Sequence, residues 1–486
     1  MAESTLSNST REPGPAPESE NQESGGHTHN PLVRYFKLLG PGLVTGASDD
    51  DPGGIATYSI AGAALGYGML WTAVATLPLT IAIQLTCARI GLVSGRGLAG
   101  VLRRYYPRRL LYLACLLLLV ANVFNISADL GGMAEVVQML TGVRSIVFVP
   151  VFGLLILAVT VYTSYATFAR YLKWLTAVLF SYVIAAFLAR PDWKSVFFAT
   201  VLPDLSRDAN SIATLVGIFG TTISPYLFFW QASQEVEEEK ALGRRTLAQR
   251  RGATEHELHD ARLDVTTGIC LSNLVFYFII LTTASTLYRV GERDIQTARQ
   301  AAEALKPLAG EAAYLLFALG IIGTGLLAIP VLAGSASFAV AELFGWRAGL
   351  DLSPRRGRRF YLVLAGAIVV GMILDLFDAN PIRMLFWSAI VNGILAPPLL
   401  VLVMLVGNNR KVMGEHTNGF WLNLLGWMAT TSLAFFDGFV VAARHYRDVD
   451  VIQHSATHPD WVGLNHPHKA LHFAPESHTN VDLGHV

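Results

Sequence analysis

The sequence predicts an all-helical integral membrane protein with eleven membrane-spanning helices, of which the first and the sixth are broken. Composition, the lengths of the apolar segments and two polar interruptions predict this class. Of the 486 residues, 52% are hydrophobic and only 15% are charged, and the mean hydropathy is +0.44. Because a water-soluble core cannot bury that much apolar surface, the lipid bilayer must be the solvent for much of the chain.

Eleven apolar segments are long enough to cross a membrane, which requires roughly 20 residues each. Backbone groups in lipid must be satisfied within their own segment, and no strand-like alternation is visible, so we expect helices. The segments lie near 38–66, 69–93, 109–138, 145–165, 167–189, 210–234, 264–288, 311–342, 359–378, 383–406 and 419–443.

Basic residues orient these segments. Lys and Arg are concentrated in the loops after the second, sixth and eighth segments, whereas the alternate loops carry few, such as Arg144 and Arg383. We expect the protein in the plasma membrane. Because cytoplasmic loops are enriched in Lys and Arg, the N-terminus is predicted to lie in the cytoplasm. Eleven crossings then place the C-terminus outside.

The two ends of the chain differ from the middle. Residues 1–33 are rich in Ser, Glu, Gly and Pro and are predicted to form a disordered cytoplasmic tail, without a removable signal peptide. Residues 446–486 form a polar, His-rich tail. Its histidines are irregularly spaced, which favours a merely polar tail over a metal-binding tract. The net charge of +0 gives no indication of a nucleic-acid partner, and no pattern indicates a cofactor.

The three cysteines, Cys87, Cys115 and Cys270, lie in apolar runs without metal-ligand spacing. We interpret them as small core residues rather than as disulfides or metal ligands.

Two segments are interrupted in the same way. The first contains Ser48-Asp49-Asp50-Asp51-Pro52-Gly53-Gly54, and the sixth contains Gly220-Thr221-Thr222-Ile223-Ser224-Pro225. Pro and Gly disfavour a continuous helix. An alternative is that these are loops ending two short segments, but apolar sequence continues on both sides of each.

The spacing of the two breaks predicts an internal repeat. They lie five helices apart, which indicates two inverted five-helix halves with a binding site near the middle of the membrane. The predicted first repeat covers residues 34–208, the second covers 209–408, and an eleventh helix covers 409–445.

Asp51 is the first candidate for a metal ligand. A carboxylate at membrane depth costs at least ~2.5 kcal/mol, so it is usually functional or paired. Consecutive helical residues point in different directions, so the three aspartates cannot all face one ligand. Asp51 directly precedes Pro52, whereas Asp49 and Asp50 are predicted to line the vestibule or to cap the broken helix.

Neutral oxygen atoms complete the predicted site. The broken helix ends expose unpaired carbonyls, so those of Ser48 and Thr221 are candidates, together with the hydroxyls of Thr221 and Ser224. This set contains no thiolate, thioether or imidazole, which suits Mg²⁺, Ca²⁺ or Mn²⁺.

At these residues the sequence resembles a known family. Gly40-Pro41-Gly42 followed by Asp51-Pro52-Gly53 is similar to the Nramp family of divalent metal transporters, whose first-helix motif is D-P-G-N. Ile83 to Ala99, Ala312 to Leu343 and Ala396-Pro397 fit as well, so the resemblance covers roughly residues 35–440. It implies a LeuT-type fold of two inverted five-helix repeats plus one helix, which works by alternating access.

The departures from the family pattern bear on the metal. The asparagine after D-P-G is Gly54, the sixth-helix M-P-H is Ser224-Pro225-Tyr226, and a tenth-helix glutamine falls at Ala389. The methionine sulfur that selects transition metals in the family is therefore missing. In this respect the sequence resembles the Nramp-related branch that is associated with magnesium transport. The shorter side chains are expected to enlarge the cavity for a partly hydrated ion.

Three polar residues have two interpretations each. Asp129 is either a proton carrier or a structural carboxylate paired with Arg383 or a backbone group, since Asn122 and Gly132 stand where the family often has glutamates. Asn273 and Asn392 form interhelical hydrogen bonds by default, and they can also reach the site.

The predicted function is transport of Mg²⁺ or Mn²⁺, with two alternatives of the same fold. One is a proton-coupled Mn²⁺ or Fe²⁺ transporter. The other is a Na⁺-coupled organic-solute symporter, although Asp51 would repel the carboxylate of such a substrate. An enzyme is not expected, because no catalytic cluster or phosphate-binding loop occurs in the spans.

Overall fold

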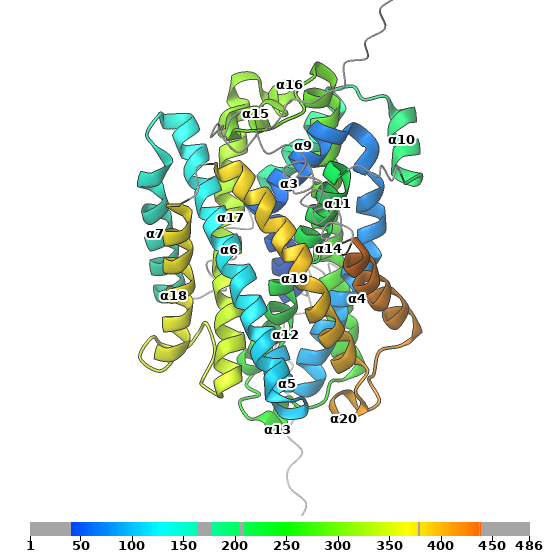
Figure 1. Cartoon of the computed structure of the whole chain (residues 1–486). Helices are drawn as coiled ribbons and strands as arrows, with labels where there is room; N and C mark the ends of the chain where they lie inside the picture. Colours follow the sequence, from blue (N-terminus) through cyan, green and yellow to red (C-terminus); the bar gives the residue numbers. More distant parts are fainter. Residues whose placement is uncertain (1–39, 164–176, 204–208, 378–379, 437, 439–486) are drawn as a thin grey trace, which may run out of the picture. The chain divides into compact units, whose positions relative to one another are not determined.

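The computed structural model describes residues 40–163, 177–203, 209–377, 380–436 and 438 (Figure 1). Every regular element in these ranges is a helix, as the sequence predicts. The two predicted tails, 1–33 and 446–486, lie outside the described residues.

The helices follow the chain in this order. They are α2 (Pro41–Asp49), α3 (Pro52–Leu65), η1 (Gly66–Met69), α4 (Trp71–Ser94), α5 (Leu98–Tyr105), α6 (Arg108–Thr141), η2 (Ser145–Val147), α7 (Phe148–Tyr162), η3 (Ala177–Phe180), α9 (Ser181–Leu188), α10 (Trp193–Val201), α11 (Ala209–Thr222), α12 (Pro225–Ala241), α13 (Leu247–Arg250), α14 (Glu255–Thr283), η4 (Ala284–Tyr288), α15 (Ala298–Glu303), α16 (Lys306–Ala309), η5 (Gly310–Ala312), α17 (Ala313–Phe344), α18 (Arg358–Asp375), α19 (Pro381–Gly407) and α20 (Arg410–Met413). A further apolar helix covers Phe420–Phe436.

Seven helical stretches in the described part are long and apolar enough to cross a membrane. They are Trp71–Ser94, Arg108–Thr141, Ser145–Tyr162, Asn210–Ala241, Glu255–Tyr288, Lys306–Phe344 and Pro381–Gly407. The other four predicted segments are not among these seven and carry α2 with α3, α9, α18 and the helix Phe420–Phe436. The count of eleven crossings therefore stays a prediction.

Both predicted breaks are present, and proline explains them. The α2 helix ends at Asp49 and α3 begins at Pro52, while α11 ends at Thr222 and α12 begins at Pro225. Proline lacks an N–H group and pushes the residue before it into an extended conformation. Asp51 and Ser224 are extended accordingly, with ψ of 169° and 133°.

Glycines let the two short first halves pack closely on other helices. A Cβ atom on Gly42 would lie 2.5 Å from the backbone nitrogen of Val265 on α14, and one on Gly46 would overlap the carbonyl of Gly268. A Cβ atom on Gly220 of α11 would likewise overlap the carbonyl of Ala389 on α19. The α2 helix is thus seated on α14, and α11 on α19.

Asp264 of α14 also holds the N-terminus of α2. Its carboxylate accepts hydrogen bonds from the backbone nitrogens of Gly40 (2.9 Å), Gly42 (2.6 Å) and Leu43 (3.1 Å). These N–H groups have no partner inside the helix, and the helix dipole favours a negative charge there. One side chain therefore caps a helix more than 200 residues away in the sequence.

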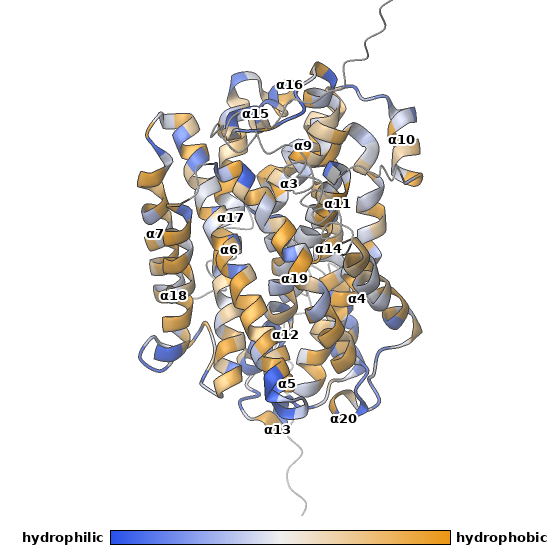
Figure 2. Ribbon diagram, viewed as in Figure 1, coloured by the Kyte–Doolittle hydropathy of each residue, from blue (hydrophilic) through white to orange (hydrophobic). Residues whose placement is uncertain are grey.

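The outer helices present apolar residues on their surface (Figure 2). On α7, for example, Val151 and Leu154 are more than half exposed. Such a surface suits contact with lipid. Cys87 and Cys115 are buried as predicted, but Cys270 is exposed on α14, so the prediction of a core position is wrong for that residue. In a membrane protein an apolar run faces lipid as readily as the core.

Candidate metal centre

The two helix breaks contact each other. The Tyr226 hydroxyl, in the first turn of α12, donates a hydrogen bond of 2.7 Å to the carbonyl of Ser48, in the last turn of α2. Tyr58 of α3 and Thr222 of α11 share a hydrogen bond of 3.2 Å between their hydroxyls. A Cβ atom on Gly54 would lie 3.2 Å from the Thr221 hydroxyl. The structure thus brings together the predicted residues of both breaks.

Asp51 is buried at the start of α3. Its Oδ1 atom accepts a hydrogen bond of 2.6 Å from the backbone nitrogen of Gly54. Asp51, rather than Asp49 or Asp50, is therefore the N-cap of the second half-helix. A carboxylate at this position is favoured by the helix dipole, and the backbone nitrogen of Gly53 also bonds to it.

Asp49 and Asp50 meet at α14 instead. Asp49 Oδ2 and Asp50 Oδ1 each lie 3.1 Å from the Ser272 hydroxyl. That hydroxyl has one proton, so it can donate to only one of the two carboxylates at a time. The other Asp49 oxygen is buried without a hydrogen-bond partner among the described residues.

Asp129 of α6 reaches the same region. It lies beside Asp51 and at the backbone nitrogen of Gly53, and its Oδ2 atom has no hydrogen-bond partner in the described structure. Arg383 is exposed and forms no ion pair with Asp129. The predicted pairing with Arg383 is therefore wrong, because Asp129 faces the interior of the bundle.

Four carboxylates are consequently buried together without a basic partner. Asp49, Asp50, Asp51 and Asp129 are 2%, 4%, 4% and 1% exposed. None forms an ion pair with Lys, Arg or His in the part of the chain that the structure describes. A buried charge is costly unless a counter-charge accompanies it. The region therefore favours cations.

The donor set consists of hard oxygen atoms. Among the described residues, no group of three or more His, Cys, Asp or Glu side chains converges as a metal cage. A cation at the breaks would thus combine few carboxylates with hydroxyl, carbonyl or water oxygens. This combination is typical of Mg²⁺, which keeps several of its waters.

The broken helix ends differ from the prediction in one respect. The carbonyls of Ser48 and Thr221 were expected to be unpaired, but both accept hydrogen bonds. Ser48 accepts from Tyr226, and Thr221 accepts from the Ser224 hydroxyl at 2.7 Å. Side-chain hydroxyls satisfy these helix ends, as buried polar groups require. Each carbonyl retains a second lone pair.

The remaining candidates lie around this centre. Asn273 donates to Thr76 of α4 at 3.4 Å, which agrees with an interhelical role. Ala389 packs its backbone on Gly220, as described above, and Asn392 is buried with an amide oxygen that has no partner in the described part. Sequence reasoning missed Ser272. A serine in an apolar helix is ordinary, and only its position before Asn273 could have drawn notice.

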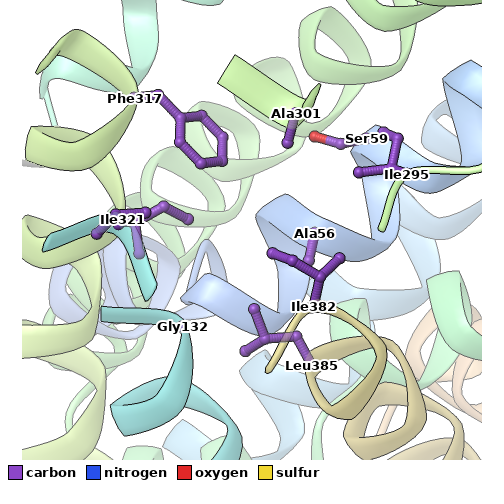
Figure 3. Close-up of a pocket in the computed structure, with 10 residues that line it drawn as sticks. Ala56, Ser59, Gly132, Ile295, Ala301, Phe317, Ile321, Ile382 and Leu385 are labelled. Atoms are coloured by element: carbon purple, nitrogen blue, oxygen red, sulfur yellow. The ribbon is translucent and has the colours of Figure 1, made fainter. Parts of the chain in front are cut away.

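Apolar side chains close the site beyond the carboxylates. Ala56 and Ser59 follow Asp51 on α3, and with Gly132, Phe317 and Leu385 they line a cavity of only about 10 Å³ (Figure 3). That volume is about the minimum for one water molecule. The cavity next to the first break is therefore too small for a hydrated ion.

The comparison with families of known proteins now has a structural setting. Residues 42–442 match the family model described as natural resistance-associated macrophage protein-like, or Nramp. The chain belongs to the Nramp family. The predicted family is thereby confirmed, whereas the assignment to the magnesium branch stays a prediction.

Relatives of this Nramp chain have names that state a function. A divalent metal cation transporter MntH from Pectobacterium carotovorum is 26% identical over 405 residues, which cover 80% of this chain and 90% of that protein. A transporter with the same name from Deinococcus radiodurans is 25% identical over 419 residues, which cover 84% of this chain and 90% of that protein.

A solved structure of another transporter shares the fold. The manganese transporter of Eremococcus coleocola superposes with a TM-score of 0.67 at 17% sequence identity, covering 85% of this chain and 87% of that one. The predicted fold class, with the first and sixth helices broken, is confirmed. The boundaries of the two repeats, 34–208 and 209–408, stay predictions.

Proposed function

We propose that this Nramp chain is a secondary transporter that carries divalent metal cations, Mg²⁺ or Mn²⁺, across the plasma membrane by alternating access. The observation that carries the proposal is the group of four buried carboxylates without a basic partner, where two broken helices meet. A transported cation supplies the missing counter-charge. Relatives named as divalent metal cation transporters support the same substrate class.

In this proposal Asp51 is the anionic ligand, and Thr221, Ser224 and the backbone at Gly54 supply neutral oxygens. The single proton of the Ser224 hydroxyl has the carbonyl of Gly220 (2.9 Å) or of Thr221 (2.7 Å) as its acceptor, so the lone pairs of the hydroxyl oxygen are free for a cation. Asp50, Tyr226 and Ser48 surround this set. Transport involves no covalent change of the substrate, so we assign no enzymatic reaction.

The hardness of these oxygens supports Mg²⁺ over iron. The first-helix glycine does not itself widen the site, because a Cβ atom at Gly54 would lie within 3.4 Å of both Thr221 and Asp51. The preference therefore rests on chemistry at Ser224, where no sulfur is available to favour softer metals. We also propose that the N-terminus lies in the cytoplasm and the C-terminus outside the cell.

A proton-coupled Mn²⁺ or Fe²⁺ transporter is the second candidate. Asp129 favours it, since its unpartnered carboxylate oxygen lies next to Asp51. A Na⁺-coupled symporter of organic solutes is a third. Nothing among the described contacts offers a positive partner for a substrate carboxylate at the breaks.

Uptake into liposomes tests these functions together. We expect purified protein to admit Mn²⁺ and Mg²⁺, reported by metal-sensitive dyes, without admitting radioactive amino acids. We also expect no acidification of the lumen, measured with a trapped pH dye. Acidification in proportion to metal uptake would instead establish proton coupling. Amino-acid uptake driven by Na⁺ would refute the metal-transport proposal.

A further inference from the structure

The helices α5 and α13 lie at one end of the bundle (Figure 1). A large bay is lined by residues of α5 and of the segment that leads into α13. Its volume is about 800 Å³, within the range of ordinary small-molecule sites. Four parts of the chain form it: the α4–α5 turn, α5, the segment from α12 to α13, and the end of α17 with the loop that follows.

The lining of the bay is strongly basic. Six basic and three acidic side chains face it, an excess of three positive charges. The basic residues are Arg96, Arg103, Lys240, Arg245, Arg250 and Arg347, and the acidic ones are Glu237, Glu342 and Asp351.

Two of the three acidic groups are already engaged. Glu237 pairs with Lys240 at 2.5 Å. Glu342 accepts backbone hydrogen bonds from Gly97 (3.1 Å) and Gly100 (2.8 Å) at the start of α5. These contacts leave Asp351 as the remaining carboxylate of the lining.

Most of the arginines, by contrast, have no acidic partner. Arg96, Arg103, Arg245 and Arg347 form no ion pair within the described ranges. Arg250 points its guanidinium at the carbonyls of Gly95, Arg244 and Arg245. The bay is therefore a positively charged cavity in which several guanidinium groups have no acidic partner among the described residues.

This charge excludes a role in conducting the cation. A metal ion leaving the helix breaks would be repelled by the excess positive charge. Enrichment of basic residues on one side of the membrane explains their number. It does not explain why residues from four parts of the chain surround one cavity.

We infer that this bay is a binding site for a phosphorylated anion. Guanidinium groups recognise phosphate through paired, charge-assisted hydrogen bonds, and several uncompensated arginines suit a ligand with more than one negative charge. The phosphate belongs either to a soluble compound or to an anionic lipid headgroup.

Calorimetric titration of the purified protein with pyrophosphate tests the soluble source. EDTA is present, so that pyrophosphate does not act by chelating metal. We expect binding that weakens about tenfold for each arginine removed in Arg245→Gln and Arg347→Gln. Both side chains are exposed, so the variants should fold, which size-exclusion elution checks. Arg104→Gln is the matched control, since Arg104 neighbours Arg103 but does not line the bay.

Thermal unfolding in detergent tests the lipid source. Here phosphatidylglycerol should raise the unfolding midpoint more than phosphatidylcholine does. The double variant, which combines Arg245→Gln and Arg347→Gln, should show the same midpoint with either lipid. Either response, lost in the double variant and kept in Arg104→Gln, supports the site and identifies the source of the phosphate. The inference is overturned if the protein responds to neither compound, or if the double variant responds as the unaltered protein does.

Discussion

At the first helix break three consecutive aspartates are buried, whereas at the second break every side chain from Gly220 to Pro225 is uncharged. Both breaks have the same backbone plan, with an extended residue followed by a proline that starts a new helix. Proline explains this shared backbone plan, because it cannot continue the preceding helix and can begin a new one. The charge is confined to one side, so a cation held between them would receive its anionic ligand from α2–α3 and neutral oxygens from α11–α12.

The breaks also differ in what holds them. Around the first, polar groups bind partners on other helices: Asp49 and Asp50 contact Ser272 of α14, and Ser48 accepts from Tyr226 of α12. At the second, Ser224 satisfies the carbonyls of its own helix end. The carboxylates of the first break thus depend on α14, whereas the Ser224 hydroxyl of the second break bonds within that break, and Thr222 there also bonds Tyr58 of α3.

The largest expected effect removes the charge from the first break. Asp51→Asn keeps an acceptor for the Gly54 nitrogen, so the N-cap survives, but the anionic ligand is lost. We expect loss of Mn²⁺ and Mg²⁺ uptake into liposomes, with normal folding. Asp260→Asn is the control, since the one ion pair of Asp260 within the described residues is with the exposed His256. Near-normal uptake by Asp51→Asn would refute the site.

A smaller effect is expected from changing the neutral break. Millimolar Mg²⁺ should compete with Mn²⁺ for uptake, and Ser224→Met should weaken this competition about tenfold, because a thioether disfavours a hard cation. Ser224→Ala separates the introduced sulfur from the lost hydroxyl. Competition assays with a Mn²⁺-sensitive dye measure the ratio. If excess Mg²⁺ leaves Mn²⁺ uptake by the unaltered protein untouched, the magnesium proposal fails.

The smallest effect concerns the support of the first break. Asp264→Ala removes the acceptor for three N–H groups at the start of α2 and should cost about 1–3 kcal/mol locally. Hydrogen exchange should quicken in residues 41–49 and stay unchanged in 209–222, because among the described residues Asp264 bonds to the start of α2 and not to α11. Equal changes in both helices would show that the two breaks do not differ in how they are held.

Much of this arrangement is encoded locally and could be predicted. Proline and glycine act on their own stretch of backbone, so the interruptions at 48–54 and 220–225 are legible without the fold. The cost of burying charge in an apolar segment also follows from the segment alone and drew notice to Asp49, Asp50 and Asp51, and the position directly before Pro52 singled out Asp51.

Other features depended on tertiary structure. Tyr226 meets Ser48 across 178 residues, Ser272 meets Asp49 across 223, and Asp264 caps α2 across 222. No local pattern specifies such partners, so the sequence left Asp129 open between two roles and left Ser48 with an apparently free carbonyl. By itself the sequence determined where the helices break and where the charge lies. Packing decided which groups meet there, because a hydrogen bond depends on distances that only the folded bundle sets.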